Sequence, residues 1–390
     1  MKDKIAKCVS SIQLSLIREM GLRAAAYDNV ISLGIGEPDF DTPAEICQAA
    51  LADALAGYTH YTPSQGDTEL LEELSGFLKH SRGLEVPPSQ IVITQGGMGG
   101  LSSSLRTLLE GDDELLLPEP HFPAHRANSA YVGGKIVYLP TSFEDGFVLR
   151  PETVEQALTP RSKVLLINSP NNPTGCVIPG QVLDELARLA VERDLVVISD
   201  EVYDRLVFKG RHESIYTRPG MDQRTVVINS FSKTFSMTGW RLGYAYGPAW
   251  LMKEMVKVVT NTTSCASSVS QRAALAALRA DQNRFDDMAA EFKARCELAY
   301  ERLKAMPGLQ VNPPLGSFYI FPSIAELTAD SQSFALDLLD QEQVVTVPGS
   351  AFGPSGEGCL RLACTVDQER LTEALDRIER FVRRYPARRA

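Results

Sequence analysis

Lys233 is the residue of this chain that most clearly invites a chemical interpretation. It lies in the stretch SFSKTFSMTGWRLGY (230–244), among small hydroxyl-bearing and apolar side chains, directly after the apolar run TVVIN. A lysine in this place is either a solvated amine on a loop or a reactive amine positioned for covalent chemistry. The other polar stretches of the sequence have to decide between the two.

Polar or glycine-rich stretches follow three other apolar runs. QGGMGG follows IVIT, SPNNPTG follows KVLLIN, and Asp200, Glu201 and Tyr203 follow LVVIS. The QGGMGG loop offers free backbone N–H groups at a predicted helix start, which favours an anion such as phosphate. A tight turn that lets the helix pack on a sheet explains it equally well. The loop matches neither the dinucleotide pattern G-x-G-x-x-G nor the P-loop pattern G-x-x-x-x-G-K-[ST].

Asp200 ends an apolar run, so its carboxylate needs a partner that offsets the cost of desolvation. Considered alone, it is equally well the N-cap of a helix. Together with Lys233, Tyr203, an Asn-rich loop and an anion-binding loop, it could hold a phosphorylated pyridine aldehyde. The lysine amine would form a Schiff base, the aspartate would pair with the ring nitrogen, and Tyr and Asn would contact the ring hydroxyl.

Arg361 lies inside CLRLAC, an otherwise apolar run that is typical of a strand. A buried arginine needs an anion. One interpretation is an internal salt bridge, and the other is a bidentate clamp for a substrate carboxylate.

Seven short apolar runs, separated in several places by helix-period segments, predict the elements that position these residues. Runs without polar alternation, separated by helices, indicate an α/β fold with a mostly parallel seven-stranded sheet covered on both faces. Ligands collect at the carboxyl ends of such strands, so the polar loops should meet at one edge. The runs are IVIT (91–94), ELLLP (114–118), KIVYLP (135–140), KVLLIN (163–168), LVVIS (195–199), TVVIN (225–229) and LGYAYG (242–247).

The two ends of the chain have a different pattern. The first 45 residues contain a short helical segment and GIGEPDFDTP, and the residues from 285 on contain long helical segments around SFYIFP, VVTVPG and GCLRLAC. A length of 390 residues favours more than one core. We therefore predict a large domain over 46–284 and a smaller α+β domain built from 1–45 and 285–390.

Composition excludes several other classes of function. The net charge of −10 argues against nucleic acid as a partner, and no apolar stretch is long enough for a signal peptide or a membrane span. The seven cysteines contain no C-x-x-C pair, which favours reduced thiols and a cytoplasmic location. His121 and His125 have the spacing of helical metal ligands, but Pro120 and Pro123 argue against a helix there, so no metal site is predicted.

Six stretches in this chain resemble the fold-type I aminotransferases that use pyridoxal 5′-phosphate. The resemblance runs from about residue 30 to the C-terminal helix and is greatest to the bacterial and archaeal aspartate and aromatic amino-acid branch. The stretches are GIGEPDFDTP, THYTPSQG, SPNNPTG, SDEVYDRLVF, SFSKTFSMTGWRLGY and VPGSAFGPSGEGCLRLA.

The resemblance implies a role for each matching residue. Lys233 would be the Schiff-base lysine and proton shuttle, and Asp200 the partner of the pyridine nitrogen, in a ping-pong transfer to 2-oxoglutarate. The remaining implied contacts are Asn172 and Tyr203 with the ring oxygen; Phe122 stacked on the ring; Ser230, Ser232, Arg241, Gly97 and Met98 with the phosphate; Arg361, Gly36 and Asn172 with the substrate carboxylate; and Tyr61 from the second subunit of a homodimer with shared active sites.

The substrate is less well defined by these motifs. Some aspartate-specific relatives carry a lysine where this chain has Met98, so an aromatic or other large side chain remains open. Ile12, Leu14 and Ile17 could close over such a substrate, although apolar residues at helical spacing more often serve packing. TTSCASSVSQRAAL and GSFYIFPSI also resemble enzymes that act on N-acetylated diaminopimelate.

Three alternatives accompany this interpretation. A β-eliminating C–S lyase on the same scaffold would use the same lysine, aspartate and arginine. A serine hydrolase would use Ser230 and Lys233 as S-x-x-K, but S-D-N and K-T-G are missing and the motif follows a strand where it should open a helix. A cofactor-sensing regulator is disfavoured because every catalytic position is filled.

Overall fold

A seven-stranded sheet forms the centre of the protein. The structure is a computed structural model that describes residues 4–10, 12 and 16–385. Strand β8 is antiparallel to both of its neighbours, β2 and β7, and the other pairings are parallel. The α/β fold with a mostly parallel sheet is therefore confirmed. In spatial order the strands are β2 (Ile91–Thr94), β8 (Gly243–Tyr246), β7 (Thr225–Ser230), β6 (Val196–Asp200), β5 (Ser162–Asn168), β3 (Glu114–Glu119) and β4 (Lys135–Pro140).

Helices cover both faces of this sheet, which is why its strands contain continuous apolar runs. In β5, Val164 and Leu166 pack against α5 (Gly96–Leu108) and α10 (Ala249–Thr263), whereas Leu165 and Ile167 pack against α7 (Pro151–Ala157) and α8 (Gly180–Glu192). Successive side chains of a strand point to opposite faces, so a strand that is buried on both faces is apolar throughout.

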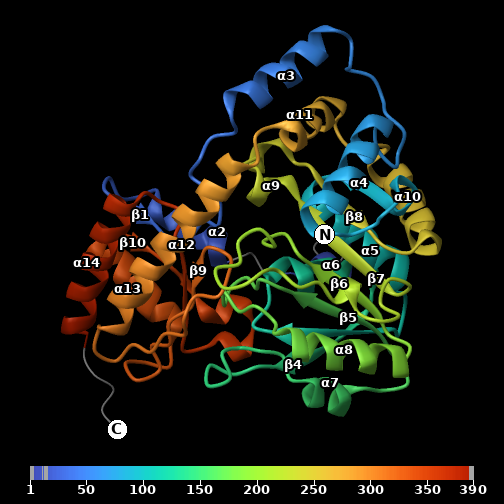
Figure 1. Ribbon diagram of the computed structural model, residues 1–390. Coiled ribbons are helices and arrows are strands. Elements are labelled where there is room, and N and C mark those ends of the chain that lie inside the picture. Colours follow the sequence, from blue (N-terminus) through green and yellow to red (C-terminus); the bar gives the residue numbers. More distant parts are fainter. Residues whose placement is uncertain (1–3, 11, 13–15, 386–390) are drawn as a thin grey trace.

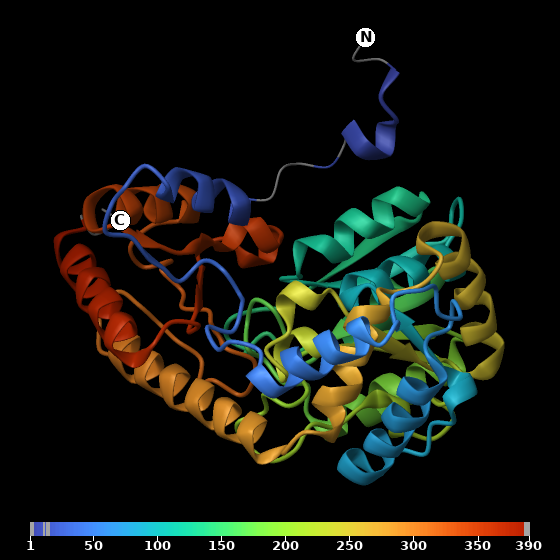
Figure 2. The same cartoon turned by 90° about the horizontal axis from the view of Figure 1, so that it is seen from above.

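A second group of elements joins the two ends of the chain. Strand β1 (Ile31–Ser32) pairs with β10 (Val344–Val345), and β12 (Leu360–Ala363) lies between β11 (Val347–Pro348) and β9 (Tyr319–Ile320). Figure 1 shows this group on the left, and Figure 2 shows it beside the large sheet from above. The domain boundaries at 45 and 285 stay a prediction. The helices of this group are α2 (Leu16–Ala24), α12 (Asn283–Lys304), α13 (Ser331–Glu342) and α14 (Gln368–Arg384).

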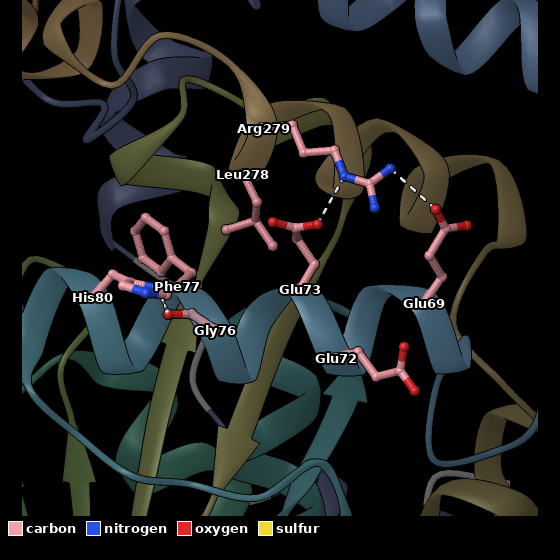
Figure 3. A pocket seen from close by; sticks show the side chains of 8 residues that line it. All are labelled: Glu69, Glu72, Glu73, Gly76, Phe77, His80, Leu278 and Arg279. Atoms are coloured by element: carbon pink, nitrogen blue, oxygen red, sulfur yellow. Dashed lines mark hydrogen bonds and ion pairs between the residues drawn. The ribbon is translucent and has the colours of Figure 1, made fainter.

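Helices α3 (Ala44–Leu55), α4 (Thr68–Arg82) and α11 (Ser268–Arg279) pack together beside β2. Asp67 begins α4 by accepting the N–H groups of Glu69 and Leu70, and Gly83 ends it at φ 68°. Figure 3 shows the groove between α4 and α11, where Arg279 donates to Glu69 at 3.0 Å and to Glu73 at 2.7 Å. No helix in the described part of the chain is long and apolar enough to cross a membrane.

Candidate active site

The carboxyl ends of β2, β5, β6 and β7 border a cavity of about 470 Å³. The polar loops meet at this edge as predicted, because all four strands run in the same direction. Of the residues to which the resemblance assigns a contact with cofactor or substrate, all except Tyr61 line the cavity. Those on or following the strands of the large sheet are Gly97, Met98, Phe122, Asn172, Asp200, Tyr203, Ser230, Ser232, Lys233 and Arg241, and those from the two end segments of the chain are Gly36 and Arg361.

Lys233 presents its amine to the interior of this cavity. It belongs to the short helix α9 (Phe231–Thr234), which follows β7, and its Nζ donates to the carbonyl of Gly36 at 2.5 Å. The pKa of Lys233 is lowered to about 8, chiefly by burial and with a contribution from the nearby guanidinium groups of Arg361 and Arg241, whereas Glu37 opposes the shift. The amine is therefore easier to deprotonate than an ordinary lysine.

Asp200 has a partner that the sequence did not predict. His125, fully buried, lies with Nε2 at 2.9 Å from Oδ2 of Asp200. His125 belongs to α6 (Pro123–Val132), so the expectation that no helix forms here is wrong from residue 123 onward. Pro123 occupies the first helical position, where proline is tolerated because its missing N–H has no partner anyway.

His121 lies outside this helix and has a separate environment. Its ring stacks on Tyr138 at 5.8 Å, and burial lowers the pKa of His121 to about 4. No group of three or more His, Cys, Asp or Glu side chains that could hold a metal occurs among the described residues.

One end of the cavity is a set of anion-binding groups. Helix α5 begins here with no side-chain cap from Gln95, so the N–H groups of Gly97 and Met98 at its first turn have no helical partner. Arg241 lies against the start of this helix. Gly96 has φ 67°, and a Cβ atom there would be 2.7 Å from Nη2 of Arg241, so this position requires glycine.

Ser230 links β7 to α9 at the same end. Its Oγ accepts the N–H of Ser232 at 3.1 Å and donates to the carbonyl of Leu242 at 3.3 Å. The S-x-x-K stretch therefore does open a helix, contrary to expectation. Its geometry still does not support a hydrolase, since the hydrogen bond of Lys233 Nζ goes to Gly36 and not to Ser230.

Arg361 forms the opposite end of the cavity. It is 2% exposed, and it donates from Nη1 to Oδ1 of Asn172 at 3.1 Å and from Nη2 to the carbonyl of Gly34. Its Nε has no partner, and none of the ion pairs in the described part of the chain involves it. The internal salt bridge weighed above is therefore absent there, and a buried guanidinium faces the cavity without a counterion.

Tyr319 also lines this end and was missed by sequence reasoning. Its hydroxyl lies 3.0 Å from that of Tyr203, and its ring centroid lies 4.6 Å from the guanidinium carbon of Arg361. Burial raises the pKa of both tyrosines, so both hydroxyls keep their protons at neutral pH. Within SFYIFP this residue lies in a short, continuously apolar run typical of a buried strand, which gave no signal of a site.

The remaining predicted residues lie away from the cavity or outside the described chain. Tyr61 is 90% exposed and does not line the cavity. Ile12 is half-buried and does not line it either, whereas Leu14 and the side chain of Ile17 lie outside the described residues.

Comparison with known proteins identifies the family. A family model described as "Aminotransferase class I and II" matches residues 28–378. The protein belongs to the class I and II aminotransferases. This aminotransferase is 40% identical to the aromatic-amino-acid aminotransferase 2 of Thermococcus litoralis, over 95% of this chain and 96% of that protein. The aspartate aminotransferase of Pyrococcus abyssi has the same identity and coverages.

A solved structure agrees with the family assignment. The crystal structure of an aromatic aminotransferase from Pyrococcus horikoshii matches this aminotransferase with a TM-score of 0.88 and 40% identity, over 93% of this chain and 98% of that chain. The family uses pyridoxal 5′-phosphate, and the protein is a transaminase.

The cavity of this aminotransferase fits that cofactor. It combines an amine of lowered pKa, a buried carboxylate, and a helix start whose N–H groups have no helical partner beside an arginine. These groups match an aldehyde, a pyridine nitrogen and a phosphate in turn.

Proposed function

We propose that the preferred amino donor of this aminotransferase is an L-amino acid with an aromatic side chain, and that 2-oxoglutarate is an acceptor. The observation that carries the proposal is the lining of the cavity. Its cations among the described residues are Lys233, Arg241 and Arg361, and each has a proposed task other than binding a side-chain carboxylate. Met98, at 40% exposed, offers an apolar surface where some aspartate-specific relatives carry a lysine.

An aromatic side chain gains more at this position than a carboxylate does. Ile35, at 54% exposed, lies on the same cavity as Met98. Covering apolar surface yields roughly 25 cal/mol per Å², so an aromatic ring over both residues is favoured. A second carboxylate, whether of aspartate or of 2-oxoglutarate, would stay in water at this open side.

We assign the cofactor contacts to the two ends of the cavity. Ser230, Ser232, Arg241 and the N–H groups of Gly97 and Met98 would hold the phosphate. Asp200 would hold a proton on the pyridine nitrogen, with His125 fixing its carboxylate by the 2.9 Å contact. Phe122 would stack on the ring, and Tyr203 and Asn172 would contact the ring oxygen.

Lys233 would carry the proton that transamination moves. When bound, pyridoxal 5′-phosphate supplies an aldehyde for the amino group and a ring that accepts electrons from the substrate Cα. Arg361, with Gly36 and Asn172, would bind the α-carboxylate and so place Cα beside Lys233. The Nζ of Lys233, in its neutral form, would remove the Cα proton and return it at the cofactor carbon.

We also propose a homodimer in which Tyr61 reaches the partner's phosphate site. Support comes from exposed apolar side chains on and after α3. Leu51 is 60% exposed, Leu55 81%, Tyr58 47% and Tyr61 90%. A cluster of this kind is typical of a surface that another chain covers. Tyr61→Phe should weaken cofactor binding, and light scattering should give twice the chain mass; a monomer with full activity would contradict both statements.

A cytoplasmic location is supported by the thiols. No disulfide joins cysteines in the described part of the chain, and burial raises the pKa of Cys176 and Cys359 to about 12, which keeps both unreactive.

A substrate panel tests the function. The protein loaded with pyridoxal 5′-phosphate is mixed with 2-oxoglutarate and one of phenylalanine, tyrosine, aspartate or N-acetyl-LL-diaminopimelate, and glutamate is measured. We expect kcat/KM for phenylalanine to exceed that for aspartate about tenfold, a difference of about 1.4 kcal/mol. Met98→Lys should reverse part of this preference. A wild-type preference for aspartate would overturn the proposal.

The same panel separates transfer from elimination. A β-eliminating lyase would release pyruvate and ammonia from cysteine-type substrates without any 2-oxo acid acceptor. We expect no such release at a rate comparable with transfer.

A further inference from the structure

The Tyr319 hydroxyl has no part in the roles assigned above, although Tyr319 lines the cavity at the Arg361 end. It is buried, lies 3.0 Å from the hydroxyl of Tyr203, and faces the side-chain amide of Asn172 at 3.5 Å. It also packs directly on Gly36, where an added Cβ atom would lie 1.8 Å from this oxygen.

The direction of the hydrogen bonds around this hydroxyl follows from Arg361. A guanidinium can only donate, so its 3.1 Å bond to Asn172 identifies the receiving atom as Oδ1 and turns the amide nitrogen of Asn172 toward Tyr319. The Tyr319 oxygen therefore faces a donor on that side. Either oxygen of the 3.0 Å pair with Tyr203 can be the donor, and because Asn172 faces the Tyr319 oxygen as a donor, we assign the proton of Tyr319 to the oxygen of Tyr203.

With this assignment, the hydroxyl proton of Tyr203 points toward the cavity. Because its oxygen accepts from Tyr319, Tyr203 is free to donate into the cavity, which it lines. A hydroxyl that accepts a hydrogen bond becomes a better donor, since the bonds of such a chain polarise one another.

We propose that Tyr319 is a positioning residue that directs the Tyr203 proton toward the cofactor ring oxygen. The proposal rests on the proposed function, and it links Arg361, the substrate carboxylate clamp, to the cofactor through Asn172, Tyr319 and Tyr203. Tyr319 touches neither the reacting carbon nor the transferred proton; it acts through Tyr203.

Tyr319→Phe tests this with a change of one oxygen atom. The ring under Arg361 is kept, so KM for the amino donor should stay within about twofold, whereas kcat should fall about threefold to tenfold, as expected for one hydrogen bond of about 1 kcal/mol. The decisive readout is the pH midpoint of the visible absorption of the cofactor-loaded protein. A weaker hydrogen-bond donor at the ring oxygen favours the protonated form of the bound cofactor. The pH midpoint of the absorption should therefore rise by about 0.5 pH unit, which is a threefold shift in the protonation equilibrium of the cofactor.

Two further variants make the outcome specific. Tyr246→Phe is the matched control, because Tyr246 is buried, its hydroxyl has no hydrogen-bond partner among the described residues, and it does not line the cavity; its midpoint should not move. In a Tyr203→Phe background, Tyr319→Phe should cause no additional shift, because the group through which it acts is gone.

An unchanged midpoint in Tyr319→Phe, or an equal shift in the Tyr203→Phe background, would overturn the proposal. Failure of the proposed function has a different signature. The protein would then show no absorption that titrates at all, or would bind the cofactor normally without transferring amino groups.

Discussion

The two ends of the active-site cavity are assembled in opposite ways. At the phosphate end, the single stretch 230–241 supplies Ser230, Ser232, Lys233 and Arg241. At the carboxylate end, the side-chain hydrogen bonds of Arg361 and Tyr319 join residues 116 to 327 positions apart in the chain. The first end is mostly one local stretch, to which the start of α5 adds Gly97 and Met98, whereas the second exists only when the chain ends pack against the large sheet.

This difference implies that the two ends can be damaged separately. Changes in the local stretch should affect the cofactor first, whereas changes in Arg361 and its neighbours should affect substrate binding with the cofactor still in place. The following predictions test that separation, beginning with the largest effect.

Lys233→Ala should lower transamination by about four orders of magnitude or more, because both the covalent and the proton-transfer roles are lost. In the wild type, borohydride should fix the cofactor to the peptide that contains Lys233, as peptide mass analysis would show. Lys253→Ala on the exposed side of α10 is the control and should keep full activity. Full activity in Lys233→Ala would refute the assignment.

Asp200→Ala should keep the cofactor bound and lower kcat by about 10³-fold, because the ring nitrogen loses the carboxylate that keeps it protonated. Absorption spectra measure the bound cofactor, and steady-state kinetics measure kcat. An unchanged rate would remove Asp200 from the mechanism.

Arg361→Lys should damage the carboxylate end alone. Lysine keeps the charge but lacks the planar, two-pronged guanidinium. The lost interaction should cost about 2–4 kcal/mol, so kcat/KM should fall roughly 30-fold to 1,000-fold, chiefly because KM rises. The cofactor spectrum should stay that of the wild type. Loss of cofactor in this variant would show that the two ends are not separable.

Gly96→Ala should damage the phosphate end alone. A side chain at φ 67° is strained and meets Arg241, so the cofactor Kd should rise about tenfold, for a cost of about 1–2 kcal/mol. Gly83→Ala is a close control, because Gly83 has φ 68° with no atom within 4 Å of the added Cβ. It should lower thermal stability without changing the cofactor Kd; an equal loss of affinity would point to general destabilisation.

The smallest effect concerns pH. The neutral amine of Lys233 is the form that reacts with an aldehyde, and its fraction grows as the pH rises through the pKa of about 8. Capture of pyridoxal 5′-phosphate by the cofactor-free protein should therefore speed up about fivefold from pH 7 to pH 8 and level off above about pH 9. Stopped-flow absorbance measures this rate. A rise that continues toward the ordinary lysine value of 10.5 would contradict the lowered pKa.

Sequence reasoning failed where a local rule was applied too strictly. Pro123 argues against a helix interior but fits the first turn, and for this reason the sequence does not predict the contact of His125 with Asp200. The S-x-x-K stretch was expected to lack a helix, yet Ser230 caps α9. In the first place proline fits the first helical position, and in the second a helix begins directly where the strand ends.

The sequence by itself determined the sheet, the residues at the carboxyl ends of its strands and, through its resemblance to a family, the cofactor of that family. Apolar runs of strand length and the loops that follow them are local properties, so their types and spacing can be read directly. Only the tertiary structure decided that Arg361 has no counterion in the described chain and that Tyr319 lies between Arg361 and Tyr203. Contacts between distant segments depend on how whole elements pack, and a short apolar run typical of a buried strand carries no sign of what its side chains will meet.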